Sequence, residues 1–185
     1  LVDSDFLASL PQEEWESGHA EMLKHTLLSG NRWTELLALE PAALALNDIE
    51  QSVAFKADIV QEDFKENGKR KILNLGHTTG HAWESYCAAS GNPCTHGTAV
   101  IQGLHVALFL SGLHDEQSAL AQRYPWQVVE EQAFEPLWEL QLQDKKNSNG
   151  EVRYVLLEQL GLPVWDVQIS LEVWTAAVLA LNSAS

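Results

Sequence analysis

The sequence predicts a mainly α-helical, multi-helical fold with a short β-hairpin near the C-terminus. Apolar residues recur at helical spacing along most of the 185 residues, with breaks at Gly68 and at the turn SGNP, residues 90–93. Residues 152–169 differ, because β-branched and aromatic residues surround Gly161 and Pro163. Hydrophobic residues make up 45% of the chain, so we expect a single globular domain over residues 1–185.

The first half of the chain contains three helical stretches, over residues 13–28, 32–46 and 47–64. The first stretch carries acidic residues early and a lysine and a histidine later, which suits the helix dipole. The second is interrupted or restarted at Pro41, a residue that fits the first turn of a helix. Asn47 or Asp48 is the expected N-cap of the third.

The second half continues the helical pattern up to the strand pair. Residues 90–93 form a turn, and two short strands are expected within residues 152–169. The helices are expected over residues 76–89, 95–112, 114–124, 126–140 and 171–182.

Composition excludes several classes of protein. The net charge of −15, from 26 acidic and 11 basic residues, argues against binding to nucleic acid or to an anionic membrane. The sequence contains neither a signal peptide nor an apolar run of about 20 residues. Two cysteines, Cys87 and Cys94, stand outside any C-x-x-C pair, so we expect reduced thiols in a cytoplasmic protein.

The segment NLGHTTGHAWE, residues 74–84, places His77 and His81 four residues apart on one face of a helix. This spacing allows two metal ligands, or one ligand and one acid/base group. Neutral imidazole suits zinc, although the glutamate of the H-E-x-x-H metalloprotease motif is absent. The alternative is that both histidines only pack, one buried with a hydrogen bond and the other exposed.

A third histidine, His96, opens the next helix after a turn, so a helical hairpin can bring it close to His77. Gly97 allows a close approach of the backbone. Further polar residues precede His77 or lie in a later loop, and each has the alternative of a solvated turn or surface loop: Glu66, Arg70, Asn74, Lys145 and Lys146.

Four segments, in this order, resemble the C-terminal half of the 3-dehydroquinate synthase family: SGHAEMLKHTLL, AFKADIVQEDFKENGKRKILNLGHTTGHAWE, THGTAVIQG and DKKNSNGEVRYVLLEQLG. The family has an NAD-binding half ahead of this region, and its active site lies in the cleft between the halves. No dinucleotide fingerprint or Walker loop is visible here. The resemblance therefore implies that residues 1–185 are the C-terminal half of a two-domain enzyme whose N-terminal NAD-binding domain is absent.

The resemblance also implies roles for individual residues. The metal, normally Zn²⁺ with Co²⁺ as the alternative, would be held by Glu21, His77 and His96. Proton transfer would fall to Glu66 and His81. The expected substrate contacts are Lys24, Lys56, Arg70, Asn74 and one of Lys145 and Lys146. No residue of this chain is assigned to NAD.

The reaction implied by the resemblance converts 3-deoxy-D-arabino-heptulosonate 7-phosphate to 3-dehydroquinate and phosphate, a step of the shikimate pathway. Zinc would favour oxidation of a substrate hydroxyl, and NAD would take the hydride and later return it. The expected partners are this sugar phosphate, the N-terminal NAD-binding domain and a second subunit of a homodimer. The chain alone is expected to be inactive.

The sequence departs from the family pattern at three positions. The family usually has an aromatic or aliphatic residue in place of Thr79, Ile in place of Trp83 and Glu in place of Thr98. Of these, Thr98 is expected to alter the surroundings of His96 and to loosen it. The alternatives are another sugar-phosphate cyclase such as 2-deoxy-scyllo-inosose synthase, a metal-dependent alcohol dehydrogenase of the same superfamily, and a non-catalytic helical interaction domain.

Overall fold

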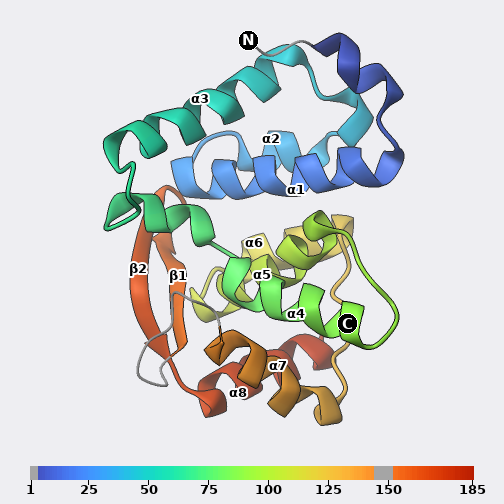
Figure 1. Cartoon of the computed structure of the whole chain (residues 1–185), viewed down its shortest axis with the longest axis vertical. Helices are drawn as coiled ribbons and strands as arrows, with labels where there is room; N and C mark the ends of the chain where they lie inside the picture. The colour runs from blue at the N-terminus through green and yellow to red at the C-terminus, as the bar shows by residue number, and fades with distance from the viewer. Residues whose placement is uncertain (1–3, 144–151) are drawn as a thin grey trace.

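The computed structural model describes residues 4–143 and 152–185 (Figure 1). The α-helices in chain order are α1 (Gln12–Ser29), α2 (Trp33–Ala38), α3 (Leu46–Glu62), α4 (His77–Ala89), α5 (His96–Leu110), α6 (His114–Arg123), α7 (Phe134–Leu142) and α8 (Leu171–Ser183). Short 3-10 helices span Ser4–Ser9, Pro41–Ala43, Lys69–Asn74 and Glu131–Ala133, and the strands are β1 (Val152–Gln159) and β2 (Leu162–Ile169). The predicted helical fold with a hairpin near the C-terminus is confirmed.

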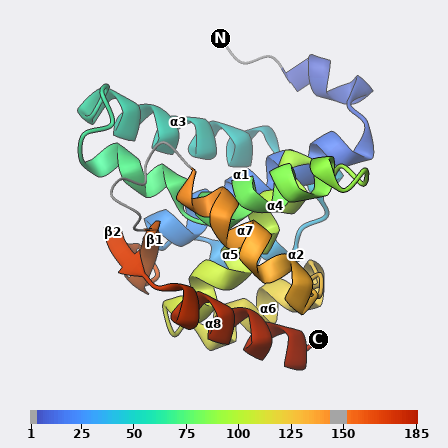
Figure 2. The same cartoon turned by 60° about the horizontal axis from the view of Figure 1, so that its bottom comes forward.

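Helix α5 is the centre of the fold. It packs against α1, α4, α6, α8 and β1, and Figures 1 and 2 both place it among them. Residues 99–108 of this helix are all buried. A helix that is apolar on every side must be enclosed by other elements, so α5 forms the core around which the other helices assemble. No helix in the described parts of the chain is long and apolar enough to cross a membrane.

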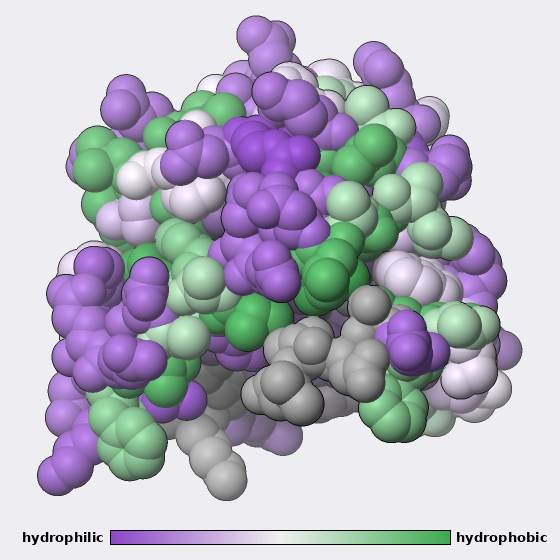
Figure 3. Space-filling view, turned by 90° about the horizontal axis from the view of Figure 1, so that it is seen from above, coloured by the Kyte–Doolittle hydropathy of each residue, from purple (hydrophilic) through white to green (hydrophobic). Residues whose placement is uncertain are grey.

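Helices α4 and α6 lie beside α5 in the middle of the molecule, and two groups of helices lie on either side of them. In Figure 1, α1, α2 and α3 lie at the top, and α7 and α8 lie at the bottom. The surface seen from above is mostly hydrophilic, with apolar groups scattered between the polar ones (Figure 3). This polar surface agrees with the excess of acidic residues in the sequence.

The β-hairpin packs its turn against the end of α1. The strands are antiparallel and pair from Val152 with Ile169 to Gln159 with Leu162. Gly161 in the turn has φ +79° and donates a backbone hydrogen bond of 2.9 Å to the carbonyl of Leu27. This contact connects the C-terminal hairpin to the helix that carries Glu21.

Two local predictions were wrong. The helix predicted over residues 126–140 begins only at Phe134, after a 3-10 turn. Asn182 on α8 accepts hydrogen bonds of 2.8 Å from the Trp126 indole and 3.0 Å from the Val129 amide, and donates one of 2.7 Å to the Val129 carbonyl. These tertiary bonds satisfy polar groups of the segment in a non-helical form, so they override its helical pattern.

The second wrong prediction is the N-cap of α3. That position is Ala45 rather than Asn47 or Asp48. Asp48 lies in the first turn, where its carboxylate accepts the amide of Ala45 at 3.0 Å and pairs with Arg32 at 2.6 Å. The carboxylate of Asp48 still accepts a backbone amide at the start of the helix that would otherwise lack a partner, but it does so from the first helical turn rather than from the N-cap position.

Candidate metal centre

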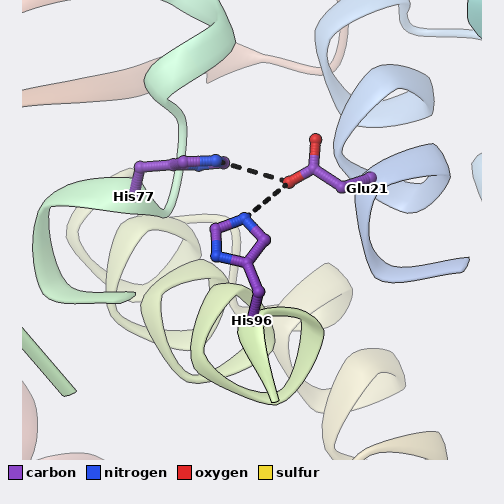
Figure 4. Close-up of side chains that lie close together, drawn as sticks. All are labelled: Glu21, His77 and His96. Carbon is purple, nitrogen blue, oxygen red and sulfur yellow. Dashed lines mark ion pairs between the residues drawn. The ribbon is translucent and has the colours of Figure 1, made fainter. Parts of the chain in front are cut away.

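Side chains from three helices meet between α1, α4 and α5. Glu21 Oε1 lies 3.3 Å from His77 Nε2 and 3.6 Å from His96 Nε2 (Figure 4). The potential ligand atoms of these three residues all lie within 4.8 Å of one another. The structure thus brings together the carboxylate and the two imidazoles that the sequence suggested as metal ligands.

A close approach of α5 to α1 makes this meeting possible. A Cβ atom at Gly97 would lie only 2.2 Å from the Cα of Ser17, so no larger residue fits without a shift of the backbone. The Gly97 amide donates to Ser17 Oγ at 3.2 Å. Since Ser17 precedes Glu21 by one helical turn, this contact places the N-terminus of α5, and with it His96, beside the carboxylate.

The hydrogen bonds of the two imidazoles define which nitrogen is free to bind a cation. His77 Nδ1 lies 3.1 Å from the Leu75 carbonyl, which can only accept, so Nδ1 carries the hydrogen. His96 Nδ1 lies 3.3 Å from the carboxylate of Glu84, which imposes the same tautomer. In both neutral rings the lone pair of Nε2 therefore points to the side of Glu21.

The carboxylate of Glu21 is placed asymmetrically. Its Oε2 accepts a hydrogen bond of 2.7 Å from Lys24, whose side chain is only 2% exposed. Its Oε1 is buried and has no hydrogen-bond partner among the described residues. Two imidazole lone pairs and a carboxylate oxygen that face one another would repel, and a divalent cation between them would remove that repulsion. This set of donors fits zinc in type, charge and number.

The protonation states of Glu21 and His77 favour a metal site, whereas His96 must give up a proton to bind a metal. Burial alone would raise the pKa of the Glu21 carboxyl, but His77, His96 and the charge of Lys24 lower it below its ordinary value. Burial lowers the pKa of His77, which favours the neutral ligand form. The pKa of His96 is raised, first by Glu21 and further by Glu84, although burial opposes this.

His81 lies beside this group rather than in it. Its ring centroid is 5.2 Å from that of His77 and 6.1 Å from that of His96. Within the described residues, the group whose ligand atoms lie within 4.8 Å consists of Glu21, His77 and His96. Histidines four residues apart thus share a face of α4 but have different positions relative to Glu21.

A loop between α3 and α4 carries a second set of polar residues. The amide nitrogen of Asn74 donates to Glu66 Oε1 at 2.8 Å, and Arg70 Nε lies 4.0 Å from Glu66 Oε2. Asp63 holds the loop, because its carboxylate accepts the backbone amides of Asn67, Gly68 and Arg70 at 3.1, 2.8 and 3.1 Å. Glu66, Arg70 and Asn74, for which the family resemblance implied roles in proton transfer and substrate binding, are therefore brought together on this loop.

The predicted lysine contacts are distributed differently. Lys24 is buried within the site and paired with Glu21, whereas Lys56 is exposed on α3. Burial is the main cause that lowers the pKa of His25 to about 4, and the charges of Lys24 and Lys56 lower it further. Lys56 is therefore close enough to His25 to interact with it electrostatically. Lys145 and Lys146 lie outside the described residues.

The three departures from the family pattern each have partners in the fold. The Thr79 hydroxyl lies 2.9 Å from that of Tyr154 and accepts a bond of 3.4 Å from the Trp174 indole. Trp83 is buried, with its ring 6.4 Å from that of Trp126. The Thr98 hydroxyl lies 3.0 Å from Thr95 Oγ1, the side chain that caps α5. Thr98 therefore supports the helix turn that begins at His96.

Sequence reasoning missed two residues of this site, Asp63 and Glu84. The signal for Glu84 was present, since it follows His77 by seven residues and His81 by three, on the same stripe of the helix. Asp63 gave no such signal, because the role of a carboxylate that holds a loop depends on backbone geometry that a pattern of residue types does not contain.

Comparison with known proteins identifies the family. Residues 18–147 match the family model described as 3-dehydroquinate synthase C-terminal. The chain belongs to the 3-dehydroquinate synthase family. It is 38% identical over 181 residues to the 3-dehydroquinate synthase of Leptospira interrogans. This match covers 90% of this chain and 50% of that protein. It is 36% identical over 193 residues to that of Parabacteroides distasonis, with 97% of this chain and 54% of the relative covered.

The chain thus spans about half the length of the curated 3-dehydroquinate synthases it matches.

The fold is also that of solved sugar-phosphate cyclases. A 2-deoxy-scyllo-inosose synthase complexed with carbaglucose-6-phosphate, NAD⁺ and Co²⁺ matches 95% of this chain and 54% of its own, with a TM-score of 0.72 and 20% identity. The structure of the 2-epi-5-epi-valiolone synthase of Streptomyces hygroscopicus has NAD⁺ and Zn²⁺ bound. It matches 100% of this chain and 56% of its own, with a TM-score of 0.75 and 19% identity.

Proposed function

We propose that this chain is the metal- and substrate-binding part of a 3-dehydroquinate synthase. In this role it acts with an N-terminal NAD-binding half and converts 3-deoxy-D-arabino-heptulosonate 7-phosphate to 3-dehydroquinate and phosphate. The observation that carries the proposal is the convergence of the potential ligand atoms of Glu21, His77 and His96 in a member of this family. The length of the relatives, about twice that of the chain, supports the need for a second half.

The metal of this proposal is Zn²⁺, with Co²⁺ as the alternative, held by Glu21, His77 and His96. A bound metal would acidify the substrate hydroxyl that it coordinates, and NAD would accept and return the hydride. Lys24 binds Oε2 of Glu21 and leaves Oε1 to face the imidazoles, and its charge adds to the effect of His77 and His96 in lowering the pKa of this carboxyl. The metals and NAD⁺ bound in the cyclase structures support this choice of cofactors.

The remaining residues bind the anionic substrate and move protons. Arg70 offers a fork of donors for a carboxylate or phosphate group, and Lys24, Lys56, Asn74 and one of Lys145 and Lys146 add further contacts. His81 adjoins both ligand imidazoles, so it is positioned to exchange a proton with a substrate at the metal. Glu66, held by Asn74, is the second proton-transfer group.

The proposal extends to partners and location. The chain would bind the sugar phosphate together with its N-terminal half, in a homodimer in the cytoplasm, and would bind neither nucleic acid nor membrane. The net charge of −15 supports the last point, since both of those partners are anionic. It also implies that the substrate is attracted by local cations rather than by the molecule as a whole.

A second candidate function is that of another sugar-phosphate cyclase, which the structural likeness to 2-deoxy-scyllo-inosose synthase favours. Both candidates share the metal and NAD, and they differ in the sugar that the pocket accepts. A non-catalytic interaction domain is the remaining alternative, and it would require neither metal nor sugar phosphate.

The test joins this chain in cis to the N-terminal half of the Leptospira interrogans relative and measures phosphate release with NAD and zinc. We expect release from the heptulosonate 7-phosphate, none from glucose 6-phosphate, and none from the 185-residue chain alone. The same fusion carrying His77→Ala is the control for dependence on the metal centre. Release from glucose 6-phosphate alone would favour the second candidate. A folded, zinc-loaded fusion inactive on both sugars would contradict the proposal.

A further inference from the structure

The two histidines of the candidate metal centre are held in unequal ways. His77 is 12% exposed, and its Nδ1 donates to a carbonyl two residues earlier in its own chain segment. His96 is 44% exposed and stands at the first position of α5. Burial and this hydrogen bond therefore restrain His77, whereas packing restrains the more exposed ring of His96 less.

Glu84 is the group that restrains this exposed ring. Its Oε2 lies 3.3 Å from His96 Nδ1, on the side of the ring opposite to the nitrogen that faces Glu21. Glu84 belongs to α4 and His96 to α5, so the contact crosses the helical hairpin. The glutamate side chain is itself 40% exposed and contributes little to the core.

Glu84 also lies on the same stripe of α4 as His77 and His81, because these positions are separated by four and three residues. One face of this helix thus carries a ligand candidate, a proton-transfer candidate and the carboxylate that contacts the third histidine. This arrangement matches the carboxylate–histidine–metal relay, in which the outer carboxylate fixes the tautomer and raises the basicity of the ligand.

We infer that Glu84 is a positioning residue for the metal centre, which fixes the ring of His96 with Nε2 turned toward Glu21 and His77. The inference rests on the proposed metal site. Glu84 itself touches neither metal nor substrate in this role, and its effect on catalysis passes through His96. Removal of its carboxylate would release the ring and reduce metal affinity while the fold persists.

Two substitutions separate positioning from simple charge attraction. Glu84→Gln removes the charge but keeps an oxygen that reaches His96, whereas Glu84→Asp keeps the charge on a side chain one methylene shorter. Positioning predicts that zinc affinity falls less in Glu84→Gln than in Glu84→Asp, while attraction between charges predicts the reverse order. Glu139→Gln, an exposed position on α7, is the control for removal of one surface charge.

The measurement is the zinc dissociation constant of the 185-residue chain, by competition with a chromophoric chelator. We expect losses of about 10- to 100-fold for Glu84→Ala and Glu84→Asp, less than about tenfold for Glu84→Gln, and none for Glu139→Gln. Circular dichroism and thermal melting of each variant confirm the fold. If Glu84→Ala alone failed to fold, the Gln and Asp pair would still decide the matter.

The outcomes distinguish this inference from the metal site on which it depends. Zinc bound equally by the wild type and all Glu84 variants would overturn the role of Glu84 and leave the metal site standing. Weaker binding in Glu84→Gln than in Glu84→Asp would assign the effect to charge and would also overturn the inference. A folded wild-type chain that binds no zinc would refute the metal site and the inference together.

Discussion

The candidate metal centre and the loop of residues 63–74 are built on different kinds of support. Glu21 and His96 stand on α1 and α5, whose backbones are in direct contact at Gly97, and His77 stands on α4, which packs against α5. Glu66, Arg70 and Asn74 stand on a loop and a 3-10 turn, held by hydrogen bonds to Asp63. Helix packing preforms the first group, whereas the second depends on a few exposed polar contacts.

This difference suggests a division of labour within the proposed active site. A metal needs ligand atoms at fixed distances, which rigid helices provide. A substrate with two anionic ends needs side chains that adjust to it, and loops provide these more readily. Changes that disturb the packing of the helices should therefore alter metal binding and stability, while changes to the loop should leave metal binding unchanged and alter substrate binding or turnover.

The largest effect is expected for His81→Ala in the fusion with an N-terminal half. This variant should retain zinc but lose about 10²–10⁴-fold in turnover, because a positioned acid/base group typically contributes that much. Metal content and kcat of the same preparation are the measurements. Loss of zinc together with His81 would make it a ligand, and unchanged turnover per folded molecule would make it a packing residue.

A smaller effect is expected from Gly97→Ala, where the added Cβ would lie 2.2 Å from the Cα of Ser17. The helices must separate, so we expect a loss of about 1–3 kcal/mol in the free energy of unfolding together with weaker zinc binding. Chemical denaturation and chelator competition measure the two effects.

Gly18→Ala is the matched control for this substitution, since nothing lies within 4 Å of an added Cβ at that position in α1. It should stabilise the chain by about 0.5–1 kcal/mol and leave zinc affinity unchanged. Equal destabilisation by both substitutions would show that the contact between α1 and α5 has no special role.

The smallest effect is expected from Asp63→Asn, which leaves one oxygen acceptor where three backbone amides now converge. In the fusion, we expect KM for the sugar phosphate to rise by about tenfold, with zinc affinity unchanged. Steady-state kinetics and chelator titration separate the two quantities. A parallel loss of zinc would show that the loop and the metal centre are not independent.

The sequence predicted more of the candidate ligand, proton-transfer and substrate-binding residues than of the residues that hold them in place, Asp63 and Glu84. The spacing of His77 and His81 indicated one face of a helix, but it left open which ring faces Glu21, since that carboxylate lies on a distant helix. The family resemblance implied that His77 is a ligand and His81 a proton-transfer residue. In the structure His77, rather than His81, groups with Glu21 and His96, and the two roles stay a prediction. The contact of Glu84 with His96 depends on how α4 and α5 pack, which spacing along one helix does not determine.

The same limit explains the error in the fold. Residues 126–133 have a helical pattern, yet Asn182 holds part of that segment in another conformation from about 50 positions away. Gln102 on α5 contributes as well, since its Oε1 accepts the Gln127 amide at 3.0 Å, so polar side chains from two distant helices hold this segment. The long apolar helix α5 was predicted correctly because most of its residues are apolar and its middle is buried on every side.

The most direct test of the central claim is the zinc content of the purified 185-residue chain after equilibration with zinc and removal of the excess. We expect one zinc ion per wild-type chain and, in the folded His77→Ala and Glu21→Ala variants, almost none, because three ligands from three helices form the site. His81→Ala is the control and should keep its zinc. A folded wild-type chain without zinc, or equal zinc in wild type and His77→Ala, would contradict the account.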